Sequence, residues 1–470
     1  MYFRPEGKAV AADVIPYYKD GVFYLYYLHD YRDAERCGEG VPWYLVKTKD
    51  FVTYSRPVEI LPRGGKEDED LYVFTGSVIE YDDTFYLFYT GHNPHLREKG
   101  RPEQCVMLAV GSDPEHFHKT DLRYFAPDTF EPHDWRDPFV YREGDHIAML
   151  LAAREKEGPF LKRGVTVKCS SRDLVRWKTD GIFYAPHNYY AHECPDLFRM
   201  GDWWYFVFSE FSDRTSTRYR MARSPEGPWI APPSDTFDAR SFYAAKTVSD
   251  GRRRYVIGWD PTREGDEDYK PWQWGGTLVV HELVQNADGT LFVRCPDAIA
   301  AQYDRELPVC EVSRFGDVSK EEGAYTLRKG GYARVMFGAL PRNCKIECEI
   351  RQDECGKDFG LALRMNETYD LGYFVKFDPV YRRMCFDRNF RPGDVPFMID
   401  SERPLGLKES VWHHLTIIVE GTVAVCYIGG VAMSVRMYDY REGGLGIFAN
   451  ECGASFRNIR IFCKEDDLQA

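Results

Sequence analysis

The sequence predicts an all-β protein made of a five-bladed β-propeller followed by a C-terminal β-sandwich. Three observations lead to this fold class. Aromatic residues, which favour strands, make up 15% of the 470 residues. A strand–turn–strand pattern recurs five times in the first 300 residues, and the pattern changes after Pro296.

Each repeat consists of an apolar strand, a short turn of Gly or acidic residues, and a second strand rich in aromatic residues. The turns lie at Asp20-Gly21, Asp82-Asp83, Glu143-Gly144, Gly201-Asp202 and Asp250-Gly251. Four-stranded units at such spacing are typical of propeller blades. We therefore expect a catalytic propeller domain over residues 1–300; a β-sandwich with irregular loops is the alternative.

The remaining chain begins with a short helix expected at Asp297–Tyr303 and continues as evenly spaced short strands with Gly-rich turns. This pattern is typical of a β-sandwich, which we expect over residues 310–470. The sandwich contributes no acid in phase with the propeller repeats, so we expect it to cover apolar propeller surface. A lectin-like role is the alternative.

Composition and charge exclude several classes of protein. The net charge of −13 disfavours nucleic acid and anionic membrane surfaces as partners. No apolar stretch is long enough to cross a membrane, and residues 1–8 lack a signal-peptide core, so we expect a cytoplasmic protein. The 13 cysteines and 12 histidines show no metal-ligand spacing, and no phosphate-binding loop is present. We expect no metal and no cofactor.

Three acidic residues occupy equivalent places in three repeats. Asp13, Asp137 and Glu193 precede their turns by seven, six and eight residues. The inner strands of a propeller line its central channel, so these residues should meet at one mouth of the channel. Two carboxylates on either side of a glycosidic bond are the minimum for its hydrolysis, and a third can bind the sugar. The pattern therefore predicts a glycoside hydrolase whose substrate is an oligosaccharide or other glycoside.

Several motifs in order resemble those of the family 32 glycoside hydrolases, the β-fructosidase group. They are Phe74-Thr75-Gly76-Ser77-Val78, Trp135-Arg136-Asp137-Pro138, Glu193-Cys194-Pro195-Asp196, Phe242-Tyr243-Ala244-Ala245-Lys246 and the segment from Trp272 to Leu283. The resemblance implies that Asp13 is the nucleophile, Glu193 the acid/base and Asp137 a stabiliser of the transition state.

The same resemblance implies a set of substrate-binding residues: Trp43, Phe74, Ser77, Arg136, Tyr243 and Trp272. His29 lies directly after the first hairpin and His192 lies beside Glu193, so both are candidates to hydrogen-bond sugar hydroxyls or to shift the pKa of the acid. Tyr189-Tyr190 and Trp272-x-Trp274 are candidate stacking platforms, whereas Trp259 is expected in the core.

The chain departs from the family around the nucleophile, where it reads Ala11-Ala12-Asp13-Val14-Ile15-Pro16 instead of Trp-x-Asn-Asp-Pro-Asn. The acids are retained while part of the fructose-binding surround is not. A retaining enzyme is the leading hypothesis. An inverting enzyme similar to family 43 and a carbohydrate-binding protein without catalysis are the two alternatives.

Overall fold

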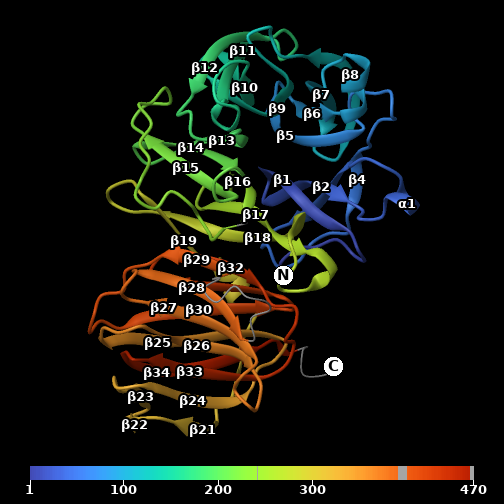
Figure 1. Ribbon diagram of the computed structural model, residues 1–470. Helices are drawn as coiled ribbons and strands as arrows, with labels where there is room; N and C mark the ends of the chain where they lie inside the picture. The colour runs from blue at the N-terminus through green and yellow to red at the C-terminus, as the bar shows by residue number, and fades with distance from the viewer. Residues whose placement is uncertain (241, 390–399, 466–470) are drawn as a thin grey trace.

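The computed structural model describes residues 1–240, 242–389 and 400–465. The fold is all-β: five antiparallel blades are arranged in a ring, with the first and fifth joined in one sheet, and a two-sheet sandwich packs against one side of that ring (Figure 1). Within the described residues, no helix combines the length and the apolar character needed to cross a membrane.

The first three blades each contain four antiparallel strands. They are β1 (Val10–Lys19), β2 (Val22–Asp30), β3 (Trp43–Thr48) and β4 (Val58–Leu61); β5 (Tyr72–Tyr81), β6 (Thr84–His92), β7 (Gln104–Asp113) and β8 (His116–Tyr124); β9 (Phe130–Glu143), β10 (His146–Glu155), β11 (Gly164–Ser171) and β12 (Lys178–Tyr184). Short helices α1 (Ala34–Cys37), η1 (Pro94–Lys99) and η2 (Phe160–Lys162) lie in loops between these strands.

The last two blades complete the ring. They contain β13 (Glu193–Met200), β14 (Trp203–Glu210) and β15 (Ser216–Ala222), then β16 (Tyr243–Ser249), β17 (Arg254–Arg263), β18 (Trp272–Gln285) and β19 (Leu291–Arg294), with the short helix η3 (Glu264–Asp266) after β17. Strand β18 pairs with β1 through Gly276 and Ala11, which joins the fifth blade to the first. All five predicted hairpins are present; four turns contain the predicted residues, and the third is Gly144-Asp145, one residue beyond the predicted Glu143-Gly144.

Each of the five innermost strands carries a β-bulge at the same height. The extra residues include Asp13, Thr75, Asp137, Cys194 and Ala244, six or seven residues before each turn. The last three have positive φ angles of 60°, 52° and 49°. A bulge changes the direction in which nearby side chains point. The repeated bulge therefore aims one ring of residues at the mouth of the central channel.

Beyond α2 (Asp297–Ala300) the chain forms two sheets that pack face to face (Figure 1). One contains β20 (Arg305–Leu307), β22 (Val318–Glu321), β23 (Ala324–Leu327), β25 (Asn343–Glu354), β30 (His413–Glu420), β31 (Val423–Ile428), β32 (Val431–Arg436) and β34 (Gly453–Cys463). The other contains β21 (Glu311–Phe315), β24 (Tyr332–Ala339), β26 (Asp358–Met365), β27 (Gly372–Asp378), β28 (Arg383–Asn389), β29 (Ser401–Pro404) and β33 (Gly444–Asn450). Alternate residues of both sheets fill one apolar core.

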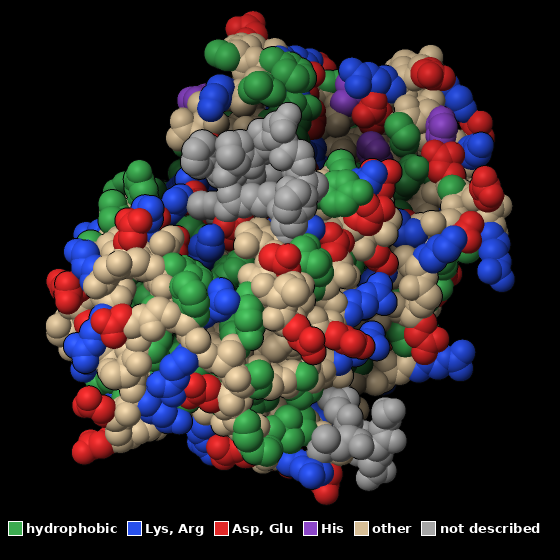
Figure 2. Space-filling model, turned by 60° about the horizontal axis from the view of Figure 1, so that its bottom comes forward, with side chains coloured by type: hydrophobic (Ala, Val, Ile, Leu, Met, Phe, Trp, Pro, Cys, Tyr) green, Lys and Arg blue, Asp and Glu red, His purple; other side chains and the backbone are tan. Residues whose placement is uncertain are grey.

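The junction between ring and sandwich is buried and partly polar. Apolar side chains of β30 to β32, among them Ile418 and Val425, belong to the same core cluster as the first blade. Asp238 accepts a hydrogen bond from Ser434 and pairs with His281, while Arg436 pairs with Asp260 at 2.7 Å. On the face shown in Figure 2, acidic and basic side chains are interspersed rather than gathered by sign.

Candidate active site

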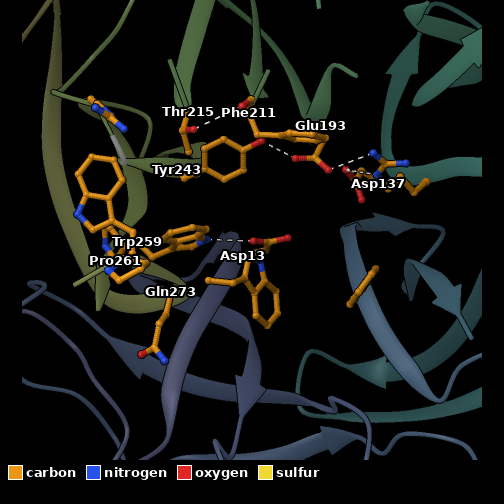
Figure 3. Close-up of a pocket in the computed structure, with 15 residues that line it drawn as sticks. Asp13, Asp137, Glu193, Phe211, Thr215, Tyr243, Trp259, Pro261 and Gln273 are labelled. Carbon is orange, nitrogen blue, oxygen red and sulfur yellow. Dashed lines mark hydrogen bonds and ion pairs between the residues drawn. The ribbon is translucent and has the colours of Figure 1, made fainter. Parts of the chain in front are cut away.

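A cavity of about 640 Å³ opens at the mouth of the propeller channel, between the ring and the loops that follow β14 and β17. The three predicted acids all line it, each from a different blade (Figure 3). Arg136, Phe74, Tyr243 and Trp272, which the sequence analysis assigned to substrate binding, line it too. The structure thus brings most of the predicted site residues together in one cavity.

Asp13 projects from the bulge of β1 and is held by three donors. Trp259 Nε1 donates to Oδ1 at 3.0 Å, Thr75 Oγ1 donates to Oδ2, and the Cys194 thiol approaches Oδ2 at 3.8 Å. Burial raises the pKa of Asp13, and the hydrogen bonds from Thr75 and Trp259 oppose that rise. Both carboxylate oxygens are therefore fixed in one orientation, which a nucleophile requires.

Asp137 lies at the bulge of β9 and is 3% exposed. Its Oδ2 accepts a hydrogen bond of 2.9 Å from the backbone N–H of Cys194, and Arg136 Nε is 4.0 Å from the same oxygen. Burial raises the pKa of Asp137 to about 7, although Arg136 acts in the opposite direction. A carboxyl group that exchanges its proton near neutral pH is typical of functional sites.

Glu193 begins β13, and its carboxyl lies beside Asp137, on the same side of the cavity as Arg136 (Figure 3). Arg136 Nη2 donates to Oε1 at 3.0 Å, and the Tyr243 hydroxyl donates to Oε2. Burial, followed by the charge of Glu193, raises the pKa of Tyr243 well above its usual range. Tyr243 therefore acts as a neutral phenol that holds the carboxyl in place.

The outer wall of the cavity is apolar and aromatic. Phe74 stacks on His92 at 4.6 Å between ring centroids and lies 6.2 Å from Trp274. The Trp272 ring has the guanidinium of Arg240 at 4.4 Å and that of Arg263 at 5.1 Å. Flat rings beside a cluster of carboxylates suit a sugar, which has apolar C–H faces and polar edges.

Four predicted substrate-binding residues lie outside the lining of this cavity. Trp43 is fully buried, and its indole N–H donates to the carbonyl of Val73 at 3.0 Å. The Ser77 hydroxyl accepts the N–H of Val140 and links β5 to β9. These two side chains link adjacent blades and do not line the cavity.

The two histidines are also buried away from the cavity. His29 stacks on Tyr44 at 4.2 Å, and burial lowers its pKa to about 4. His192 is fully buried and packs on Phe208 at 4.8 Å, and burial lowers its pKa to about 3. The prediction that they donate to sugar hydroxyls does not fit this geometry, because neither side chain lines the cavity and both rings pack against neighbouring aromatic side chains.

Several residues that line the cavity were not predicted from the sequence. Trp259 belongs to the buried core, as expected, and its indole N–H also donates to Asp13. Phe211, Thr215, Arg240 and Gln273 come from loops and strand ends around the rim. The position of Trp259 opposite Tyr243 in the β16–β17 hairpin is the signal that could have identified it.

This chain is similar in sequence and in structure to known proteins. Residues 10–295 match the family model described as the glycosyl hydrolases family 32 N-terminal domain. A sucrose-6-phosphate hydrolase of Escherichia coli is 26% identical over 271 residues, covering 54% of this chain and 55% of that protein. A raffinose invertase of Escherichia coli is 24% identical over 299 residues, covering 59% and 60%. The chain spans about half the length of the curated relatives that it matches first.

The match extends to solved structures along nearly the whole chain. The sucrose-6-phosphate hydrolase of Lactobacillus gasseri superimposes with a TM-score of 0.74 at 17% identity, covering 99% of this chain and 93% of that one. A likeness at this identity establishes the shared propeller-and-sandwich fold. Because the family model covers more than half of the sequence, the chain belongs to glycosyl hydrolase family 32.

Proposed function

We propose that this protein is a retaining glycoside hydrolase that acts on fructosides, with Asp13, Glu193 and Asp137 as its catalytic residues. The observation that carries the proposal is the convergence of these three carboxyl groups, from three blades, on one cavity. Membership of family 32 supports the fructoside class.

In the first step, Asp13 attacks the anomeric carbon while Glu193 donates its proton to the glycosidic oxygen. The bond between that carbon and oxygen breaks, the leaving sugar departs as an alcohol, and a covalent ester forms on Asp13. Thr75 and Trp259 hold the attacking carboxylate in place, since both donate to it.

In the second step, Glu193 removes a proton from a water molecule, which attacks the same carbon and releases Asp13. Asp137 and Arg136 lie beside the reacting sugar, where the carboxylate accepts hydrogen bonds from hydroxyls and the guanidinium donates to them. Arg136 also contacts both Asp137 and Glu193, so it fixes their relative positions.

The names of the relatives make sucrose-6-phosphate and raffinose the first substrates to test. We further propose that residues 1–300 form the catalytic domain and residues 310–470 a supporting domain. The pairs between Arg436 and Asp260 and between Ser434 and Asp238 would hold the two together.

The decisive experiment compares Asp13→Asn and Glu193→Gln with the parent on sucrose, sucrose-6-phosphate, raffinose and a non-fructose pentoside. We expect the parent to cleave at least one fructoside, and each variant to lose roughly 10³-fold or more in kcat. The anomeric configuration of the first product, followed by NMR, separates retention from inversion. Measurable sugar binding without turnover of any substrate by the parent would instead favour the carbohydrate-binding alternative.

A further inference from the structure

Three aromatic side chains form a line that leads out of the cavity over the third and fourth blades. We call Phe211, Tyr190 and Phe160 the aromatic strip. Phe211 lines the cavity, its ring centroid is 5.2 Å from that of Tyr190, and Tyr190 is 5.5 Å from Phe160. Phe160 is 60% exposed and Phe211 is 45% exposed. The strip is therefore not part of the buried core, and its rings are partly exposed to solvent.

The rings of the strip are held in place from below. The guanidinium of Arg154 lies 3.6 Å from the centre of the Tyr190 ring and 4.6 Å from that of Phe160. Arg154 is 2% exposed and donates to Asp134 at 3.1 Å and to the backbone carbonyl of Phe160 at 2.6 Å. Cation–π contacts of this kind fix ring positions before any ligand arrives.

The strip lies on the Glu193 side of the cavity. Asp134, which binds Arg154, also accepts a hydrogen bond of 2.7 Å from Arg136, and Arg136 donates to Glu193. Figure 3 places Phe211 next to Thr215 and Glu193. On the proposed function, Glu193 protonates the oxygen of the leaving group, so the leaving group extends from the reacting sugar toward this side.

We propose that the aromatic strip binds the second and further sugar units of the leaving group by stacking on their C–H faces. This inference rests on the proposed function and adds a substrate class to it: neutral oligosaccharides with two or more sugar units beyond the scissile bond. A neutral ligand fits because the cations beneath the rings already have anionic partners. Arg154 pairs with Asp134, and Arg163, 5.2 Å from the Phe160 ring, pairs with Glu131 at 3.0 Å.

Sucrose, raffinose and stachyose test the strip, because they share one fructosyl bond and have leaving groups of one, two and three sugar units. We expect Phe160→Ala to lower the ratio of kcat/KM for stachyose to that for sucrose by roughly three- to tenfold. Phe160→Tyr should keep the ratio of the parent, since it preserves the ring. The matched control is Phe315→Ala on the sandwich, where a phenylalanine 57% exposed also has a guanidinium, that of Arg334, 5.3 Å from its ring.

Binding of stachyose to the Glu193→Gln protein, measured by calorimetry, tests the strip independently of turnover. We expect adding Phe160→Ala to weaken this binding by the same factor. The proposal would be overturned if Phe160→Ala changed neither the kcat/KM ratio nor the affinity for stachyose. It would also be overturned if Phe160→Ala left the kcat/KM ratio unchanged and lowered the molecular mass of the protein in solution, because the strip would then be a surface for self-association. A parent that binds stachyose through Phe160 but cleaves no fructoside would contradict the proposed function and leave the strip standing.

Discussion

The cavity and the junction between propeller and sandwich both contain buried charges, and the two regions pair these charges differently. At the junction, Asp260 has Arg436 at 2.7 Å and Asp238 has His281 at 2.7 Å. In the cavity, Asp137 and Glu193 share Arg136 as their ion-pair partner, whereas Asp13 is held by the neutral donors Thr75 and Trp259. A buried carboxylate without its own cation is costly. The junction thus pairs its buried carboxyl groups with basic side chains, whereas the cavity holds an excess of negative charge.

The largest expected effect comes from removing one charge of that excess. Asp137→Asn should lower kcat by roughly 10²- to 10³-fold, because a transition-state partner is lost. It should also raise the free energy of unfolding at pH 8 by on the order of 2 kcal/mol. Between about pH 4 and pH 7 the folded protein holds a proton on Asp137 that the unfolded chain has released, so this carboxyl lowers stability as the pH rises through that range.

Urea unfolding at pH 5 and pH 8 checks this prediction. The exposed turn variant Asp82→Asn is the control and should leave both the stability and its pH dependence unchanged. If Asp137→Asn were less stable than the parent at both pH values, the cavity would not carry the electrostatic cost described above.

The junction should respond in the opposite way. Arg436→Met should lower the free energy of unfolding by about 3–5 kcal/mol, because it leaves Asp260 buried without its partner. The kcat of the folded fraction should stay within a few-fold of the parent, since the acids in the cavity are untouched. Burial already raises the pKa of Asp260 to about 6, so the loss should be larger at pH 8 than at pH 5.

Adding Asp260→Asn to Arg436→Met should recover part of the lost stability, because the unpaired charge is then gone. Denaturant melts of the single and double variants measure this recovery. If Arg436→Met instead lowered kcat 100-fold and left the free energy of unfolding unchanged, the junction would support activity rather than stability, and the proposed difference between the two regions would be wrong.

The smallest effect concerns one donor in the cavity. Trp259→Phe removes the indole N–H that donates to Asp13, so the ionised form of Asp13 loses a hydrogen bond worth roughly 1.5–3 kcal/mol. The pKa of Asp13 should rise, and the acidic limb of the kcat/KM profile should move to higher pH by about one unit. Trp177→Phe, which removes an indole N–H bound to the carbonyl of Leu174 far from the acids, should leave the profile in place. If the kcat/KM profile of Trp259→Phe did not move, the hydrogen bond from Thr75 alone would be enough to keep Asp13 ionised.

Much of the fold could be predicted because turn chemistry repeats in the sequence. Acidic and glycine turns such as Asp20-Gly21 and Glu143-Gly144 mark the hairpins, and their spacing gives the number of blades. The acids could be found because they lie six to eight residues before those turns. The family resemblance assigned Trp43 to substrate binding and the position beside Glu193 assigned His192, and the structure buries both away from the cavity.

The sequence by itself determined the repeat, and with it which strands are innermost and which acids share a height on them. Only the tertiary structure decided which side chains face the cavity, because that depends on where each bulge shifts the register. Asp13 is the extra residue between Ala12 and Val14, so it points to the channel while its neighbours point to the core. Ring closure decided the rest: Trp259 reaches Asp13 across 246 residues of sequence, a contact that follows from the fifth blade joining the first.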